Sequence, residues 1–252
     1  MRPIVLVDPT PDESARAAAV RLRLLLVESQ RRHGTAAAAL SGGSAALAPL
    51  SAPALRRGAA DLDPRLLDLW WADERHVPGE HPHRNDTAAI AALGELCPPP
   101  DRLHRVAGTD VSLEQAAADY DCAFSTWVAA CVGTGRPPLD VALLGVGPDG
   151  HVASLFPGRP EADATAFAVA VADAPKPPPA RVSLTLRALE LADEVWLLAN
   201  GRAKAPAVAA AVAGDPSLPA SRVRGRLRTR WFLDADAAAD LSPGVIADQP
   251  EP

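Results

Sequence analysis

Short apolar runs alternate with longer helical patterns along this chain, and the alternation restricts the folds that it can form. Ile4–Val7 is a run of aliphatic residues, three of them β-branched. Thr10–Glu13 then combines a capping hydroxyl, a proline at the first helical position and a glutamate three residues after the cap. Apolar residues recur at helical spacing from there to about Arg32. A strand followed by a helix is therefore expected at the N-terminus.

The same alternation continues towards the C-terminus. Further strands are expected at Ala36–Leu40, Leu66–Ala72, Leu139–Val146, Phe167–Val171 and Val195–Ala199, and further helices at Thr87–Leu96, Leu113–Cys131 and Ala203–Val212. A helix is also expected after Ser44, where Pro49 and Pro53 predict that it is short, kinked or displaced. Nearly continuous apolar runs suit strands that are covered on both faces. The pattern thus predicts an α/β fold with a doubly wound, mostly parallel sheet flanked by helices.

The length of 252 residues allows one large core. Three proline-rich stretches interrupt the pattern, but none is long enough to separate independent domains. We expect a single domain over residues 1–241, followed by a polar C-terminal tail over residues 242–252.

Charge and cysteine content exclude several classes of function. The net charge of −6 disfavours nucleic-acid binding, and the alternating arginines of Arg222–Arg230 fit a strand or extended segment with one charged face. Cys97, Cys122 and Cys131 are scattered and form no CxxC pair, which argues against a disulfide framework or structural zinc. The N-terminal apolar run is too short for a signal peptide, and no membrane-spanning run is present. A cytoplasmic protein without nucleic-acid or membrane partners is expected.

Arginine greatly outnumbers lysine in this sequence. Of the 25 basic residues, only Lys176 and Lys204 are lysines. The skew, together with abundant alanine and proline, suggests GC-rich coding. A lysine that persists against that bias is a candidate for a specific role.

Polar and glycine-rich segments follow three of the expected strands. Ligands of open α/β sheets bind beyond the carboxyl ends of the strands, so Ser41–Ser44, Asp73–Arg75 and Gly145–His151 are the candidate site segments. The glycines of Ser41–Ser44 leave amide groups free to bind an anion at a helix N-terminus. The segment could equally be a tight turn with Ser44 as an ordinary N-cap, and it is not the glycine fingerprint of dinucleotide binding.

The other two segments carry titratable side chains. Arg75 could hold a phosphate, or Asp73–Arg75 could be a surface turn with a salt bridge. Asp149 and His151 lie two residues apart in a glycine-rich turn. A histidine there can accept a proton from water, and a nearby carboxylate can orient the imidazole. The simpler interpretation is a turn histidine that is hydrogen-bonded to the backbone.

In this order, three motifs resemble the 6-phosphogluconolactonase family: Leu40–Ser44 (LSGGS), Trp71–Pro78 (WADERHVP) and Gly145–Pro157 (GVGPDGHVASLFP). The similarity covers about residues 4–240. It implies a single Rossmann-like α/β fold, related to those of glucosamine-6-phosphate deaminase and ribose-5-phosphate isomerase. It also implies hydrolysis of 6-phospho-D-glucono-1,5-lactone to 6-phospho-D-gluconate in the oxidative pentose phosphate pathway, without a cofactor or metal.

The resemblance also implies roles for individual residues. His151 is expected to activate water, and Asp149 is expected to orient the imidazole of His151. The expected substrate-binding residues are Ser41, Gly42, Gly43, Ser44, Asp73, Arg75, Arg84, Asn85, Arg181 and Lys204. The ligand is a phosphorylated sugar lactone, and the protein is expected to be a monomer or a weak homodimer.

Some positions depart from the family pattern. Val152 stands where the family usually has threonine, and Arg84 replaces the serine of a Ser-Asn pair while Asn85 is retained. Arg84 is expected to face the site nonetheless.

Two other functions remain open. An amino-sugar phosphate deaminase or isomerase would share Asp73, Asp149 and His151, but it would carry a glutamate where this chain has Phe156. A non-catalytic sugar-phosphate-binding protein would keep the pocket and lose the chemistry. A metalloenzyme is disfavoured, since no carboxylate-histidine helix motif is present.

Overall fold

The computed structural model of the protein describes residues 2–57 and 61–245. Residues 246–252 of the expected C-terminal tail lie outside the described residues. The domain boundary at residue 241 therefore stays a prediction.

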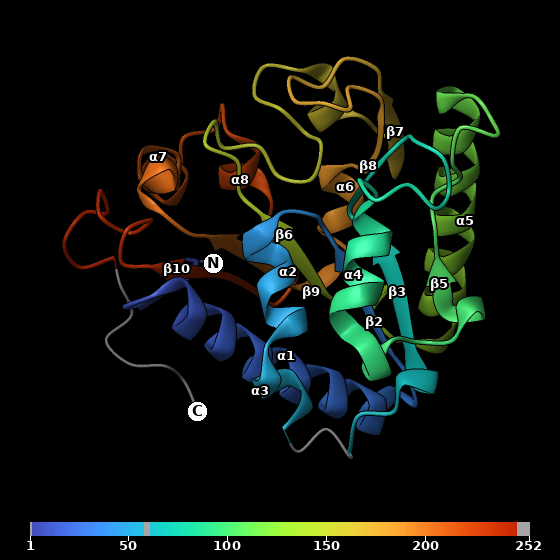
Figure 1. The fold of residues 1–252 in the computed structure, drawn as a ribbon, viewed down its shortest axis with the longest axis horizontal. Helices are drawn as coiled ribbons and strands as arrows, with labels where there is room; N and C mark the ends of the chain where they lie inside the picture. Colours follow the sequence, from blue (N-terminus) through green and yellow to red (C-terminus); the bar gives the residue numbers. More distant parts are fainter. Residues whose placement is uncertain (1, 58–60, 246–252) are drawn as a thin grey trace.

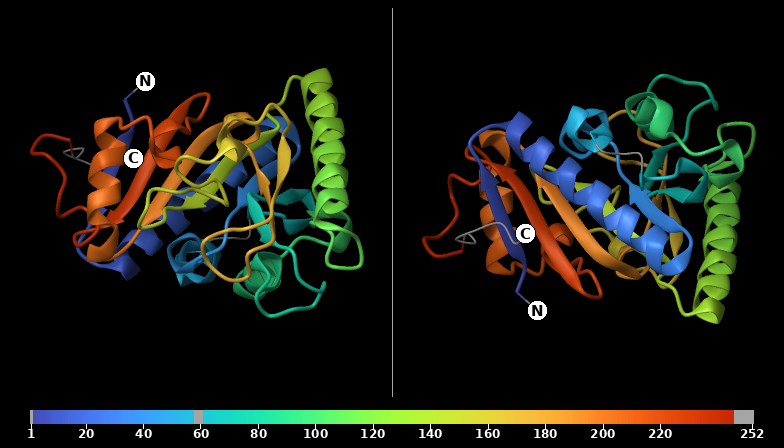
Figure 2. Two further views of the ribbon diagram at one scale, coloured as in Figure 1. Left: turned by 90° about the horizontal axis from the view of Figure 1, so that it is seen from above. Right: turned by 90° about the horizontal axis from the view of Figure 1, so that it is seen from below.

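A parallel sheet forms the centre of the molecule (Figures 1 and 2). Within the described residues it has seven strands in the order β1-β10-β9-β6-β2-β3-β5. Their bounds are β1 Ile4–Asp8, β2 Ala36–Leu40, β3 Leu67–Trp71, β5 Leu103–His104, β6 Leu139–Gly145, β9 Ala192–Ala199 and β10 Arg228–Asp234. The chain runs outward from β2 in one direction and from β6 in the other. The topological switch point thus lies between β2 and β6, where a crevice opens beyond the carboxyl ends of the strands.

Helices cover both faces of this sheet, which confirms the expected doubly wound α/β fold. The helices are α1 Pro11–His33, α2 Ser44–Ser51, α3 Pro53–Arg56, α4 Asn85–Leu93, α5 Leu113–Thr134, α6 Leu186–Leu189, α7 Ala205–Ala213 and α8 Pro219–Arg222. Side chains from α1 to α4 pack in one buried cluster, and those from α5 and α7 pack in another. Successive residues of β2 alternate between the clusters, because the side chains of a strand point to opposite faces. A sheet buried on both faces explains the nearly continuous apolar runs.

A second sheet lies beside the carboxyl ends of the central strands. Among the described residues it contains β4 Asp73–Arg75, β8 Arg181–Leu184 and β7 Ala168–Val171, and its pairs are antiparallel. The alternative interpretation of Asp73–Arg75 as a surface turn was wrong, because this segment pairs with β8, which its polar sequence does not predict. The structure thereby fixes Asp73 and Arg75 on a strand beside the crevice.

Local signals set the ends of the helices. Thr10 caps α1, since its Oγ1 accepts from the amide of Glu13 at 3.2 Å and donates to the Glu13 carboxylate at 2.9 Å. Helix α2 contains Pro49 and ends at Ser51, and Ala52 is extended, as the residue before a proline prefers to be. The expected short helix after Ser44 is confirmed.

The Arg222–Arg230 stretch was only partly predicted. Strand β10 begins at Arg228, whereas Arg222 ends helix α8. No helix in the described part of the chain has the length and apolar character needed to cross a membrane.

Candidate active site

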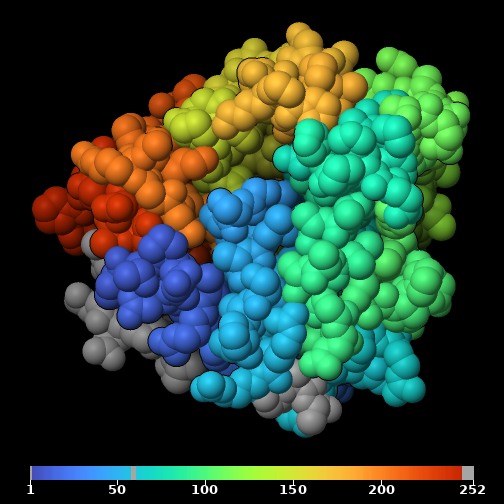
Figure 3. Space-filling view, viewed as in Figure 1, coloured from blue at the N-terminus to red at the C-terminus, as the bar shows by residue number. Residues whose placement is uncertain are grey.

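A cavity of about 260 Å³ opens at the switch point between β2 and β6. Its walls come from the loops after these two strands, from β4 and β8, and from the segments that precede β8 and α7. The lining residues are Ser41, Gly42, Gly43, Ser44, Ala45, Asp73, Arg75, Asn85, Gly145, Val146, Gly147, His151, Ala153, Lys176, Pro177, Arg181, Asn200 and Lys204. Figure 3 shows this face of the molecule, where the light blue start of α2 meets yellow-green and amber segments around a hollow.

Ten of the residues expected at the site line this cavity: Ser41, Gly42, Gly43, Ser44, Asp73, Arg75, Asn85, His151, Arg181 and Lys204. Asp149 is outside this list, but its carboxylate is hydrogen-bonded to His151. Segments far apart in the sequence therefore meet where the resemblance placed them, although the role of each residue stays a prediction.

The Ser41–Ser44 loop is tied to the loop after β6. The hydroxyl of Ser41 accepts a hydrogen bond from the amide of Gly145 at 3.0 Å. Helix α2 begins at Ser44 with Gly43 as its N-cap, so the interpretation of Ser44 as an ordinary N-cap was wrong. The amides of the first turn of a helix have no helical acceptor. They are available to an anion in the cavity.

Close packing requires glycine at position 42. A Cβ on Gly42 would lie 1.9 Å from the side-chain oxygen of Asn85. Asn85 is buried and donates from Nδ2 to the carbonyl of Asp73 at 2.8 Å, which joins the start of α4 to β4. The glycine loop thus lies directly against the Asn85 amide.

His151 and Asp149 form a hydrogen-bonded pair. The Nδ1 atom of His151 lies 2.5 Å from Oδ1 of Asp149, and the His151 side chain is 14 % exposed. A Cβ on Gly147 would lie 2.0 Å from Nδ1, so only glycine leaves room for this ring. A proton on Nδ1 that is donated to the carboxylate leaves Nε2 as the basic nitrogen.

The electrostatics of the pair favour a neutral imidazole beside a charged carboxylate. Burial lowers the pKa of His151 below its ordinary value of 6.5, and the carboxylate of Asp149 opposes this fall. Burial alone would raise the pKa of Asp149, but the charge and the hydrogen bond of His151 outweigh it and hold the pKa low. The imidazole can therefore accept a proton near neutral pH.

The residues that follow His151 are apolar. Val152 is fully buried in the core, where its side chain packs among aliphatic neighbours. The Phe156 ring lies with its centroid 4.7 Å from that of the imidazole. This aromatic contact contributes to the burial that lowers the pKa of His151.

The cavity is locally cationic in a protein whose net charge is −6. The cations that line it are Arg75, Arg181 and the two lysines. Asp73 is the one acidic residue among the lining side chains that the structure describes. Nζ of Lys204 donates to the carbonyl of Val146 at 2.6 Å, and burial, followed by the charge of Lys176, lowers the pKa of Lys204. Lys176 was absent from the expected site, although the scarcity of lysine pointed to it.

Arg84 does not line the cavity, contrary to expectation. Its side chain is 1 % exposed, and its guanidinium donates to the carboxylate of Asp86 and to the carbonyl of Val106. Burial and the nearby Asp86 raise the pKa of Glu74, whose carboxylate lies 3.7 Å from Arg84, to about 7. Arg84 is therefore the cation of a buried cluster with Glu74 and Asp86.

The buried carboxylate of Glu74 supports the wall that contains Asn85. It accepts from the amides of Asn85 at 2.7 Å and of Asp86 at 2.8 Å, at the start of α4. Acceptors at this position satisfy amides that the helix leaves unpaired. The sequence offered no sign that Glu74 would be buried.

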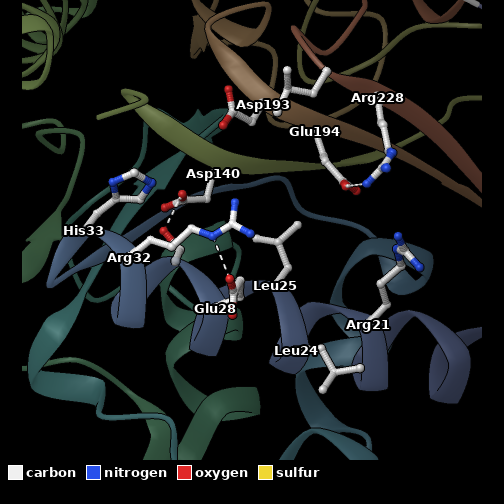
Figure 4. Close-up of a pocket in the computed structure, with 12 residues that line it drawn as sticks. Arg21, Leu24, Leu25, Glu28, Arg32, His33, Asp140, Asp193, Glu194 and Arg228 are labelled. Atoms are coloured by element: carbon white, nitrogen blue, oxygen red, sulfur yellow. Dashed lines mark hydrogen bonds and ion pairs between the residues drawn. The ribbon is translucent and has the colours of Figure 1, made fainter. Parts of the chain in front are cut away.

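Another cavity, of about 300 Å³, lies between α1 and the amino ends of β6, β9 and β10 (Figure 4). Charged side chains of this cavity form ion pairs with one another, as Figure 4 shows for Arg32 with Glu28 and for Arg228 with Glu194. It lies away from the carboxyl ends of the strands, where such folds bind ligands. Within residues 2–57 and 61–245, no group of three or more His, Cys, Asp or Glu side chains is placed to hold a metal ion.

Comparison with known proteins agrees with this geometry. The family described as "Glucosamine-6-phosphate isomerases/6-phosphogluconolactonase" matches residues 9–231. A 6-phosphogluconolactonase of Streptomyces coelicolor is 44 % identical over 95 % of each chain. One of Mycobacterium tuberculosis is 39 % identical over 92 % of this chain and 96 % of its own.

A solved structure shares the fold as well. The 6-phosphogluconolactonase of Trypanosoma brucei has a TM-score of 0.79 and 26 % sequence identity, covering 96 % of this chain and 99 % of its own. The matches span nearly the whole chain and include every segment that lines the cavity. The protein therefore belongs to the glucosamine-6-phosphate isomerase/6-phosphogluconolactonase family.

Proposed function

We propose that this protein hydrolyses 6-phospho-D-glucono-1,5-lactone to 6-phospho-D-gluconate, as the resemblance of its motifs implied. The observation that carries the proposal is the His151–Asp149 pair at a cavity whose other charged side chains are mostly cationic. A neutral imidazole suits base catalysis of water attack on a carbonyl carbon. The surrounding cations suit a substrate that bears a phosphate.

The proposed reaction uses His151 twice. Nε2 accepts a proton as water adds to the lactone carbonyl, and Asp149 stabilises the imidazolium that forms. The carbon–oxygen bond to the ring oxygen then breaks, and the imidazolium returns the proton to that oxygen. The products are an open-chain hydroxy acid and a neutral His151, so the enzyme is restored.

Phosphate binding is assigned to groups around the start of α2. Ser41–Ser44, Arg75, Arg181 and Lys204 all line the cavity. Amides at a helix N-terminus together with arginine or lysine side chains form a common phosphate site. The two ends of the substrate would thereby be held by different loops.

The scattered cysteines support a cytoplasmic location. The proposed reaction would be a step of the oxidative pentose phosphate pathway. A monomer or weak homodimer is the proposed state in solution, which sedimentation at several protein concentrations tests.

The test is hydrolysis of freshly made 6-phosphogluconolactone, measured against its spontaneous rate and beside unphosphorylated gluconolactone. The proposal predicts turnover above background with a clear preference for the phosphorylated lactone. Ammonia release from glucosamine 6-phosphate would instead indicate a deaminase. Tight binding of 6-phosphogluconate without lactone turnover would indicate a non-catalytic binding protein.

A further inference from the structure

The only two lysines in the sequence line the same cavity. Lys204 comes from the segment before α7, and Lys176 comes from the proline-rich segment 175–179 before β8. The proposed phosphate site includes Lys204 and leaves Lys176 without a role. All other basic residues among the 25 are arginines.

The Lys176 side chain is exposed at the edge of the cavity. In the described part of the chain, no hydrogen bond or ion pair of its ammonium group is found. The positive charge of Lys176 nevertheless acts on groups inside the cavity. Burial is the largest cause that lowers the pKa of Lys204 and of His151, and the charge of Lys176 lowers both further. An ammonium near two other basic groups is repelled by them, and an anion bound between them relieves that repulsion.

The main chain of Lys176 is held although its side chain is exposed. Arg181 is 5 % exposed, and its Nη2 donates to the carbonyl of Lys176 at 2.7 Å while its Nε donates to that of Pro178 at 3.1 Å. The amide of Ala174 donates to the carbonyl of Pro179 at 2.9 Å, which closes the segment. Three consecutive prolines, 177–179, restrict φ. The loop therefore presents Lys176 at a fixed place.

The other cations that line the cavity already donate hydrogen bonds to backbone carbonyls. Arg75 donates from Nη1 to the carbonyl of His83 at 2.7 Å, and Lys204 donates to Val146. Arg181 has two of its five guanidinium donors directed at loop carbonyls and a third near the hydroxyl of Ser154, at 3.4 Å. Among the cations of this cavity, Lys176 is thus the one whose three donors are all available within the part of the chain that the structure describes.

We propose that Lys176 determines the specificity for a phosphorylated substrate by contacting the phosphate, and that Arg181 positions it through the carbonyls of the proline-rich segment. The inference rests on the proposed function. The phosphate would lie between the ammonium groups of Lys176 and Lys204. The unphosphorylated lactone would gain nothing from Lys176.

The test compares Lys176→Gln with Lys176→Arg, using Arg16→Gln as a charge-matched control on the exposed side of α1. Turnover of 6-phosphogluconolactone and of gluconolactone is measured, and calorimetry gives the Kd of 6-phosphogluconate. Loss of one charged contact predicts that Lys176→Gln raises both KM for the phosphorylated lactone and this Kd by about tenfold. Lys176→Arg should retain most of the binding, and Arg16→Gln should leave all the values unchanged.

The outcomes separate this inference from the proposed function. An equal effect of Lys176→Gln on both lactones, or no effect on either lactone or on the Kd, would overturn the role of Lys176. If the wild-type protein failed to hydrolyse either lactone, the proposed function would fall, yet a higher Kd for Lys176→Gln would still show that this residue contacts the bound anion.

A double-mutant cycle tests the positioning role of Arg181. If Arg181 acts through Lys176, Lys176→Gln should weaken 6-phosphogluconate binding much less in an Arg181→Lys background than in the wild type. Equal effects in both backgrounds would show that the two residues act independently. Circular dichroism of each variant checks that the compared proteins are folded.

Discussion

Replacement of Asp149 with asparagine isolates the charge beside His151. Asparagine with its Oδ1 towards the ring accepts the Nδ1 proton, which preserves the place and the tautomer of the imidazole. What is lost is the negative charge 2.5 Å from Nδ1 at the moment when the imidazolium forms. The variant should therefore lower kcat without unfolding the protein.

The magnitude follows from the exposure of the two side chains. Unit charges about 4 Å apart attract by about 1 kcal/mol in water and by about 4 kcal/mol at the effective dielectric of a protein surface. Asp149 is 43 % exposed and His151 is 14 % exposed, so the pair lies between these limits. A loss of about 2 to 3 kcal/mol corresponds to a fall in kcat of roughly 30- to 150-fold.

The pH dependence gives a second, independent readout. Burial lowers the pKa of His151 and Asp149 opposes this, so removing the carboxylate should lower that pKa further. Since the neutral imidazole is the base, the acidic limb of kcat/KM should move to lower pH even as the plateau falls.

Initial rates of 6-phosphogluconolactone hydrolysis, corrected for the spontaneous reaction between about pH 5 and 8, measure both effects. A plateau within about threefold of the wild type would show that the imidazolium gains little from the carboxylate. An acidic limb that moved to higher pH would refute the assigned electrostatics.

Three further variants test other parts of the site. Lys204→Ala should raise KM more than it lowers kcat, and unchanged kinetics would rule out a phosphate contact. Gly42→Ala places a Cβ 1.9 Å from the Asn85 side-chain oxygen, so it should lower the free energy of unfolding by about 1 to 3 kcal/mol and impair activity. The control is Gly133→Ala, whose Cβ would meet no atom within 4 Å and which should leave activity unchanged. Arg84→Ala leaves the buried carboxylates of Glu74 and Asp86 without their cation. Urea titrations should then show a free energy of unfolding that is lower by about 3 to 5 kcal/mol, and a loss below about 1 kcal/mol would contradict these ion pairs.

The central sheet could be predicted because burial on both faces leaves a clear mark in the sequence. Ala36–Leu40 is apolar at every position and forms β2 with the expected bounds. The capping box at Thr10 likewise marked the start of α1. Local chemistry determines such features, so a single sequence reveals them.

The small sheet and the buried charges depend instead on distant partners. Asp73–Arg75 is a strand only because β8 pairs with it. Arg84 is buried because carboxylates from neighbouring elements surround its guanidinium, whereas an arginine in a loop sequence is normally expected in solvent. Pairing across the fold overrides the local preference in both cases.

Motifs predicted which segments line the cavity, while the roles of their residues stay predictions. Asp149 and His151 could be paired from their spacing, and the glycine loop could be placed from its position after a strand. Lys176 was missed because it belongs to no motif that the resemblance assigned, although the scarcity of lysine drew attention to it. Composition offered a clue there that motif matching did not use.

The most direct measurement is the turnover of 6-phosphogluconolactone by wild-type protein and by a folded His151→Ala variant, each corrected for spontaneous hydrolysis. We expect turnover well above background for the wild type and a loss of about 10²- to 10⁴-fold for the variant. A variant that retains wild-type turnover would contradict the assignment of His151 as the base.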